Sequence, residues 1–80
     1  MHTPILSPAD LGHLVRLVRS RRGLSQVLLA EQLGVTQRWL SELETGRGKH
    51  LDERYFRVLE MLGIRLSAEI DDPAPEPAAG

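Results

Sequence analysis

The feature that most constrains the fold is a pair of short helical segments separated by a glycine, in the run LSQVLLAEQLGVTQRWLSELETG that begins at Leu24. Apolar residues recur at helical spacing on both sides of Gly34, and Ser25 and Thr36 can each cap a helix. Gly34 can adopt the positive φ that a tight turn between two helices requires. The pattern predicts a helix-turn-helix over Gln26–Glu44, with its second helix starting near residue 37. A generic helical hairpin is the alternative.

Two more helices are expected around this pair. Ser7-Pro8-Ala9-Asp10 has the composition of a helix start, and this first helix should end at Gly23. Asp52 is expected to cap a fourth helix that reaches Leu62. The predicted fold class is therefore all-α, a domain of four to five helices. The residues expected to form its core are Leu11, Leu14, Val15, Val18, Leu29, Ala30, Leu33, Val35, Leu40, Leu43, Tyr55, Val58, Leu59 and Leu62.

The spacing of apolar residues along the sequence changes after the fourth helix. Apolar residues at Ile64, Leu66, Ala68 and Ile70 alternate with polar ones, which is a strand pattern. A lone strand leaves its backbone groups without partners, so we expect it to pair with the same strand of a second copy. The organisation predicted is an arm over 1–6, a helix-turn-helix domain over 7–63, a dimerisation strand over 64–70 and a disordered, acidic Pro/Ala-rich tail over 71–80.

The charge of the chain is unevenly distributed, although its net value is only −1. Residues 13–50 carry seven lysines and arginines against three acidic side chains. Residues 51–80 carry three arginines against seven acidic side chains. A basic half joined to an acidic half indicates two faces with different partners; chance clustering on a solvated surface is the alternative.

Several classes of function are disfavoured. The three histidines are scattered without metal-ligand spacing, no glycine-rich phosphate loop occurs, and 80 residues leave little room for a substrate cavity. We therefore expect no catalytic residue, no metal and no cofactor, and the protein is not predicted to be an enzyme. No apolar run is long enough for a bilayer and the first residues do not resemble a signal peptide. The absence of cysteine fits a reducing cytoplasm.

The second helix of the pair has a polar outer face. With Leu40 and Leu43 turned inward, Arg38, Ser41, Glu42 and Thr45 face outward and Gln37 lies on the border. Glutamine can bind adenine and arginine can bind guanine in the major groove, each with two hydrogen bonds. Candidates for contacts to the DNA backbone, or alternatively for merely solubilising charges, are Arg19, Arg22, Arg47 and Lys49.

Two residues of this helix have two interpretations each. Glu42 could accept a hydrogen bond from cytosine, but pairing with Arg38 four residues earlier is favoured. Trp39 could stack on a sugar or a thymine methyl group, but covering the rim of the core is favoured.

The run SQVLLAEQLGVTQRWLSELETG resembles the helix-turn-helix of the phage-repressor, or XRE, family. Together with SPADLGHLVRLVRSRRGLSQ and FRVLEMLGIRLSAEI, it resembles the HipB-like antitoxins of bacterial toxin–antitoxin modules, over about residues 5–71. The resemblance implies that Gln26 touches a phosphate and braces the second helix of the pair. It implies that Thr36, Gln37 and Arg38 enter the major groove, with Ser41 and Thr45 further along the same face.

The same resemblance implies the partners. They are a homodimer, a palindromic operator of double-stranded DNA near the protein's own promoter, and a kinase toxin of the HipA type, in the bacterial cytoplasm close to the nucleoid. A stand-alone XRE-type regulator without a toxin is the first alternative. A module that binds only protein is the second, because the acidic half and the unpaired strand are features of protein interfaces.

Overall fold

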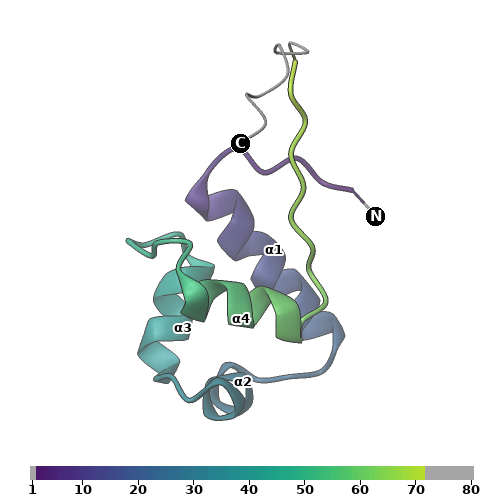
Figure 1. Ribbon diagram of the computed structural model, residues 1–80. Coiled ribbons are helices and arrows are strands. Elements are labelled where there is room, and N and C mark those ends of the chain that lie inside the picture. Colours follow the sequence, from purple (N-terminus) through teal and green to yellow (C-terminus); the bar gives the residue numbers. More distant parts are fainter. Residues whose placement is uncertain (1, 72–80) are drawn as a thin grey trace.

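The computed structural model describes residues 2–71 and contains four α-helices (Figure 1). Helix α1 spans Pro8–Arg21, α2 spans Gln26–Leu33, α3 spans Gln37–Glu44 and α4 spans Glu53–Met61. Helix α3 packs against both α1 and α2. The predicted all-α architecture is confirmed with four helices. None of these helices, in the described part of the chain, has the length and apolar character needed to cross a membrane.

All four helices begin at a residue whose side chain accepts a hydrogen bond from the backbone three positions later. The capping residues are Ser7, Ser25, Thr36 and Asp52, as predicted. The four capping distances lie between 2.9 and 3.1 Å. Each cap satisfies one of the free N–H groups at a helix start, so the sequence itself sets where each helix begins.

The core lies where the four helices converge. Its buried apolar residues are Leu11, Val15, Leu29, Ala30, Leu33, Leu40, Leu43, Tyr55, Val58, Leu59 and Leu62. All of them were expected from helical spacing. The expected core residues Leu14, Val18 and Val35 are only half-buried, and the last two pack against the edge of the cluster.

The turn between α2 and α3 depends on Gly34. This residue has φ +71° and ψ 31°, in the left-handed region that favours glycine. The next residue, Val35, donates its backbone N–H to the carbonyl of Ala30 at 3.0 Å, which closes the end of α2. The chain can therefore turn and start α3 within three residues.

The start of α1 lies directly against the end of α3, and a glycine makes this contact possible. A Cβ atom at Gly12 would lie 2.9 Å from the carbonyl carbon of Glu44 and closer still to the carbonyl oxygen of Leu43. Backbone atoms of a helix cannot move aside as a flexible side chain can. The spacing between α1 and α3 is therefore fixed by the absence of a side chain at residue 12.

The segment after α4 does not form a strand within the single chain that the structure describes. Residues 64–70 leave the end of α4 as an unpaired trace that reaches beyond the helices (Figure 1). Ile64 packs against the core, whereas the side chains of Leu66, Ala68 and Ile70 are exposed. The pairing of two such strands stays a prediction. The predicted disordered tail lies, except for Asp71, outside the described residues.

Candidate nucleic-acid interface

A buried ion pair joins α1 to the last turn of α3. Arg19 donates from Nε to Oε2 of Glu44 at 2.6 Å and from Nη2 to Oε1 at 3.0 Å. Its third nitrogen donates to the backbone carbonyl of Leu24 at 2.7 Å. The two side chains are only 10% and 2% exposed. Two parallel hydrogen bonds between a guanidinium and a carboxylate fix the relative orientation of the two groups as well as the distance between them.

This arrangement corrects the expectation that Arg19 contacts the DNA backbone. The guanidinium is turned into the protein because it lies on the buried side of α1, four residues after Val15. Glu44 was not identified from the sequence as a functional residue. The signal was nevertheless present, because Glu44 follows Leu40 by four residues and therefore shares the inward side of α3.

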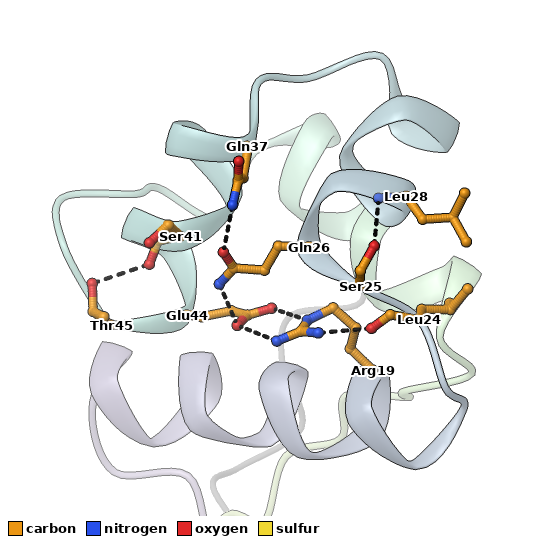
Figure 2. Close-up of polar contacts among 9 residues, drawn as sticks. All are labelled: Arg19, Leu24, Ser25, Gln26, Leu28, Gln37, Ser41, Glu44 and Thr45. Carbon is orange, nitrogen blue, oxygen red and sulfur yellow. Dashed lines mark hydrogen bonds and ion pairs between the residues drawn. The ribbon is translucent and has the colours of Figure 1, made fainter.

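The polar contacts continue from the ion pair to the exposed start of α3 (Figure 2). Gln26 donates from Nε2 to Oε1 of Glu44 at 3.0 Å. This bond fixes which end of the Gln26 amide points outward, because a carboxylate accepts only from the NH₂ group. The remaining Gln26 oxygen accepts a longer bond, 3.4 Å, from Nε2 of Gln37. The first residue of α3 is thus connected to a group buried behind it.

The outer face of α3 presents polar side chains to solvent. Thr36, Gln37 and Thr45 are exposed, Ser41 is half-buried, and the Arg38 side chain is 88% exposed. An open, shallow depression is lined by Gln37, Arg38, Ser41, Glu42 and Arg47. Five polar or charged groups therefore share one accessible surface, which we call the α3 face.

Thr45, at the end of α3, is already engaged within the protein. Its hydroxyl donates to the backbone carbonyls of Ser41 and Glu42, at 3.2 and 3.1 Å, and the first of these bonds is drawn in Figure 2. The Thr45 oxygen can still accept a hydrogen bond. Arg22, another predicted contact to the DNA backbone, has its guanidinium beside Gly63, after the end of α4.

A cation from the α3–α4 loop lies against the α3 face. Lys49 donates to Oε1 of Glu42 at 2.8 Å, while Arg38 approaches the other carboxylate oxygen at 3.4 Å. The favoured pairing of Glu42 with Arg38 is confirmed, but the shorter contact to Lys49 was missed. This hydrogen bond and the charge of Lys49, followed by those of Arg38, hold the pKa of Glu42 below its usual value.

Trp39 lies between two cations and the core. Its ring packs against the edge of the hydrophobic cluster, which confirms the interpretation that it covers the rim of the core. The ammonium of Lys49 lies 5.7 Å from the ring centre and the guanidinium carbon of Arg54 lies 4.8 Å from it. Both distances are within the range of cation–π attraction. Lys49 of the loop, Arg54 of α4 and the edge of the core therefore hold the ring in place.

Within residues 2–71, no three histidine, cysteine or acidic side chains are gathered as metal ligands. The α3 face instead combines the Glu42 carboxylate with one amide, one hydroxyl and two guanidinium groups. The amide, the hydroxyl and the guanidinium groups are of the kinds that hydrogen-bond to base edges and phosphates.

Comparison with known proteins places the chain among helix-turn-helix proteins. Residues 10–64 match the family of helix-turn-helix domains. A protein of Sinorhizobium fredii, the uncharacterized HTH-type transcriptional regulator y4mF, is 41% identical over 62 residues, which cover 78% of this chain and 82% of that protein. The antitoxin HipB of Escherichia coli O6:H1 is 28% identical over 75 residues, 92% of this chain and 80% of its own length.

Solved structures give the same answer at the level of the fold. In a HipB–O4 20mer complex, the matching chain superposes with a TM-score of 0.74 and 26% identity, over 89% of this chain and 100% of its own length. A chain of a HipA–HipB–O2–O3 complex also superposes with a TM-score of 0.74, at 25% identity and over the same shares of the two chains.

The buried ion pair should contribute strongly to stability. Arg19→Met leaves the Glu44 carboxylate buried without its cation, and breaking such a pair costs about 3–5 kcal/mol. The double variant Arg19→Met/Glu44→Leu removes the stranded charge as well, so it should lose less stability than the Arg19 variant alone. Urea denaturation followed by circular dichroism measures both. If the single and double losses were equal, Arg19 would act by packing rather than by its charge.

Proposed function

Because the chain belongs to the helix-turn-helix domain family, we propose that it reads a specific operator in double-stranded DNA and represses transcription from it. It is a helix-turn-helix DNA-binding regulator similar to HipB antitoxins. The observation that carries the proposal is the α3 face. Its residue Gln37, the first residue of α3, is connected through Gln26 to the buried Arg19–Glu44 pair. A helix held in this way offers its side chains to the major groove in one orientation.

The proposed base contacts come from the start of α3. Gln37 suits adenine and Arg38 suits guanine, because each can form two hydrogen bonds to the corresponding base edge. Thr36 precedes them, and Ser41 and Thr45 lie further along the same helix, where a hydroxyl oxygen can accept from a base or reach a sugar. One such two-bond contact contributes about 1–3 kcal/mol of discrimination between base pairs.

The proposed phosphate contacts lie beside these residues. Gln26 is the first residue of α2, and helix starts favour phosphate because their free N–H groups point outward. Arg47 is exposed on the loop after α3 and lines the same depression as Arg38. Contacts of this kind set the register of the protein on the duplex without reading its sequence.

We propose that two copies bind together through residues 64–70. The segment is extended, and Leu66 and Ile70 remain 42% and 78% exposed in the single chain. Pairing with the same segment of a second copy would satisfy its backbone groups and cover these side chains. Two α3 helices related by a two-fold axis would then meet half-sites of a palindrome about 34 Å apart.

We also propose a kinase toxin of the HipA type as a second protein partner. The support is the similarity to HipB over most of the chain and the superposition on a chain of a HipA–HipB–O2–O3 complex. Under this proposal the protein is a non-enzymatic antitoxin that regulates its own operon and neutralises the toxin, in the bacterial cytoplasm where both DNA and toxin are reached.

The DNA-binding proposal is tested by a band shift on the DNA upstream of the gene, at two salt concentrations. The wild type should prefer this DNA over random DNA, and binding should weaken steeply with salt. Arg38→Ala should reduce the preference by roughly fivefold or more, since it removes one two-bond base contact. Equal binding to upstream and random DNA by the wild type would favour a protein-only interaction module instead.

The dimer is tested with two truncated chains, of which the longer is the control. A chain ending at Gly63 lacks the proposed strand, and a chain ending at Asp71 keeps it. Analytical ultracentrifugation should show weaker dimerisation for the shorter chain only. A full-strength dimer of the shorter chain would place the interface on the helices.

The toxin is tested by co-expression with any kinase-like protein encoded beside this one. The antitoxin proposal predicts that the two proteins co-purify and that co-expression relieves growth arrest. A kinase that arrests growth equally with and without this chain would leave a stand-alone regulator as the function.

A further inference from the structure

Lys49 is the single lysine of the sequence, and it does not behave as a free cation in the structure. Its side chain is 20% exposed, compared with 88% for Arg38. The ammonium is used twice within the protein, at 2.8 Å from Oε1 of Glu42 and at 5.7 Å from the centre of the Trp39 ring. Both contacts hold the ammonium against α3, so extending the side chain away from α3 towards a phosphate would weaken them.

Glu42 explains why a cation is needed at this place. It lies in the last turn of α3, where no basic residue is present to offset the negative end of the helix dipole. It also lines the depression on the α3 face, close to where DNA phosphates would approach. An unpaired carboxylate there would repel the DNA and attract the nearest guanidinium.

We propose that Lys49 is a positioning residue for DNA recognition, which occupies Glu42 so that the Arg38 guanidinium stays free to reach a base pair. The proposal rests on the proposed DNA-binding function. It replaces the expectation that Lys49 contacts a phosphate directly. Lys49 acts through Glu42 and Arg38, without touching the DNA.

The two contacts of Glu42 show how Lys49 and Arg38 compete for its carboxylate. Lys49 donates to one carboxylate oxygen at 2.8 Å, and Arg38 contacts only the other, at the longer distance of 3.4 Å. An exposed pair with this spacing and with arginine before the acid is weak, and DNA can replace it at little cost. Without Lys49, no second cation would neutralise the Glu42 carboxylate, and a two-bond pair with Arg38 would hold the guanidinium against its own helix.

Trp39 keeps Lys49 in this position. The ring packs against the core on one side and lies within cation–π distance of both Lys49 and Arg54. The ammonium therefore has an aromatic and an anionic neighbour, both supplied by α3. The low pKa of Glu42 agrees with a carboxylate that remains charged and paired in the free protein.

The experiment compares Lys49→Gln, Glu42→Gln and the double variant. The readout is the ratio of affinities for the selected upstream DNA and for random DNA, because a general change of net charge affects both affinities. Lys49→Gln should lower this ratio by roughly fivefold or more, the value of one lost base contact. The double variant should return to the ratio of Glu42→Gln alone, because Arg38 no longer has an anion to bind. Lys49→Arg, which keeps the charge, should keep the ratio.

Arg47→Gln is the matched control for a phosphate contact. It should weaken binding to both DNAs and reduce the dependence of log affinity on log salt by about one, without lowering the ratio. A double variant with a ratio as low as that of Lys49→Gln would overturn the proposal, and so would a Lys49→Gln variant that behaved like Arg47→Gln. A wild type without any preference would instead overturn the DNA-binding function, and this proposal with it.

The free protein provides a second readout that does not involve DNA. Trp39 is the only tryptophan, so its fluorescence reports on the cations beside its ring. Lys49→Gln should shift its emission, whereas Arg47→Gln should not. Unchanged emission in the Lys49 variant would mean that Lys49 does not occupy this position in solution. Thermal unfolding followed by circular dichroism confirms that each variant is folded.

Discussion

The structure depends on the buried pair between Arg19 and Glu44. Taking two charges out of water is costly, and this cost is offset here by two parallel hydrogen bonds, by the Leu24 carbonyl and by the Gln26 amide. These contacts reach α1, the loop after it, α2 and α3. Hydrogen bonds weaken steeply when their distance or angle departs from the optimum, so a set of short, directional bonds limits how far the helices can shift. The pair therefore determines how α3 is oriented on the rest of the domain.

Two glutamates at the end of α3 are each neutralised by a cation from another part of the chain. Glu42 and Glu44 both lie in its last turn, where a negative charge opposes the helix dipole, and each is paired with a cation from outside the helix. Arg19 approaches from the buried side and Lys49 from the solvent side. The close contact at Gly12 adds a steric limit to these electrostatic ones. A helix of eight residues is thus held from three directions, while its outer side chains remain accessible.

Most of the fold could be predicted from the sequence because its signals are local. The capping residues Ser7, Ser25, Thr36 and Asp52 and the turn at Gly34 are each set by a few neighbouring residues. The outer face of α3 follows from helical spacing alone. The roles of Arg19 and Lys49 could not be derived in this way. Helical spacing can place Arg19 on the same side of α1 as Val15, but it does not identify a partner, and a lysine in a loop is usually solvated. What decides them is the partner across the fold, 25 residues away for Arg19. The proposed pairing of residues 64–70 involves a second chain, so it cannot be seen in the structure of a single chain.

The shortness of α3 has a thermodynamic consequence. Eight residues are too few for a helix that is stable by itself in water. The proposed DNA-reading surface therefore exists only in molecules whose whole domain is folded. Any ligand that binds only the folded form shifts this equilibrium towards it by mass action. Under the proposed function, binding to the operator would therefore also raise the population of the folded chain.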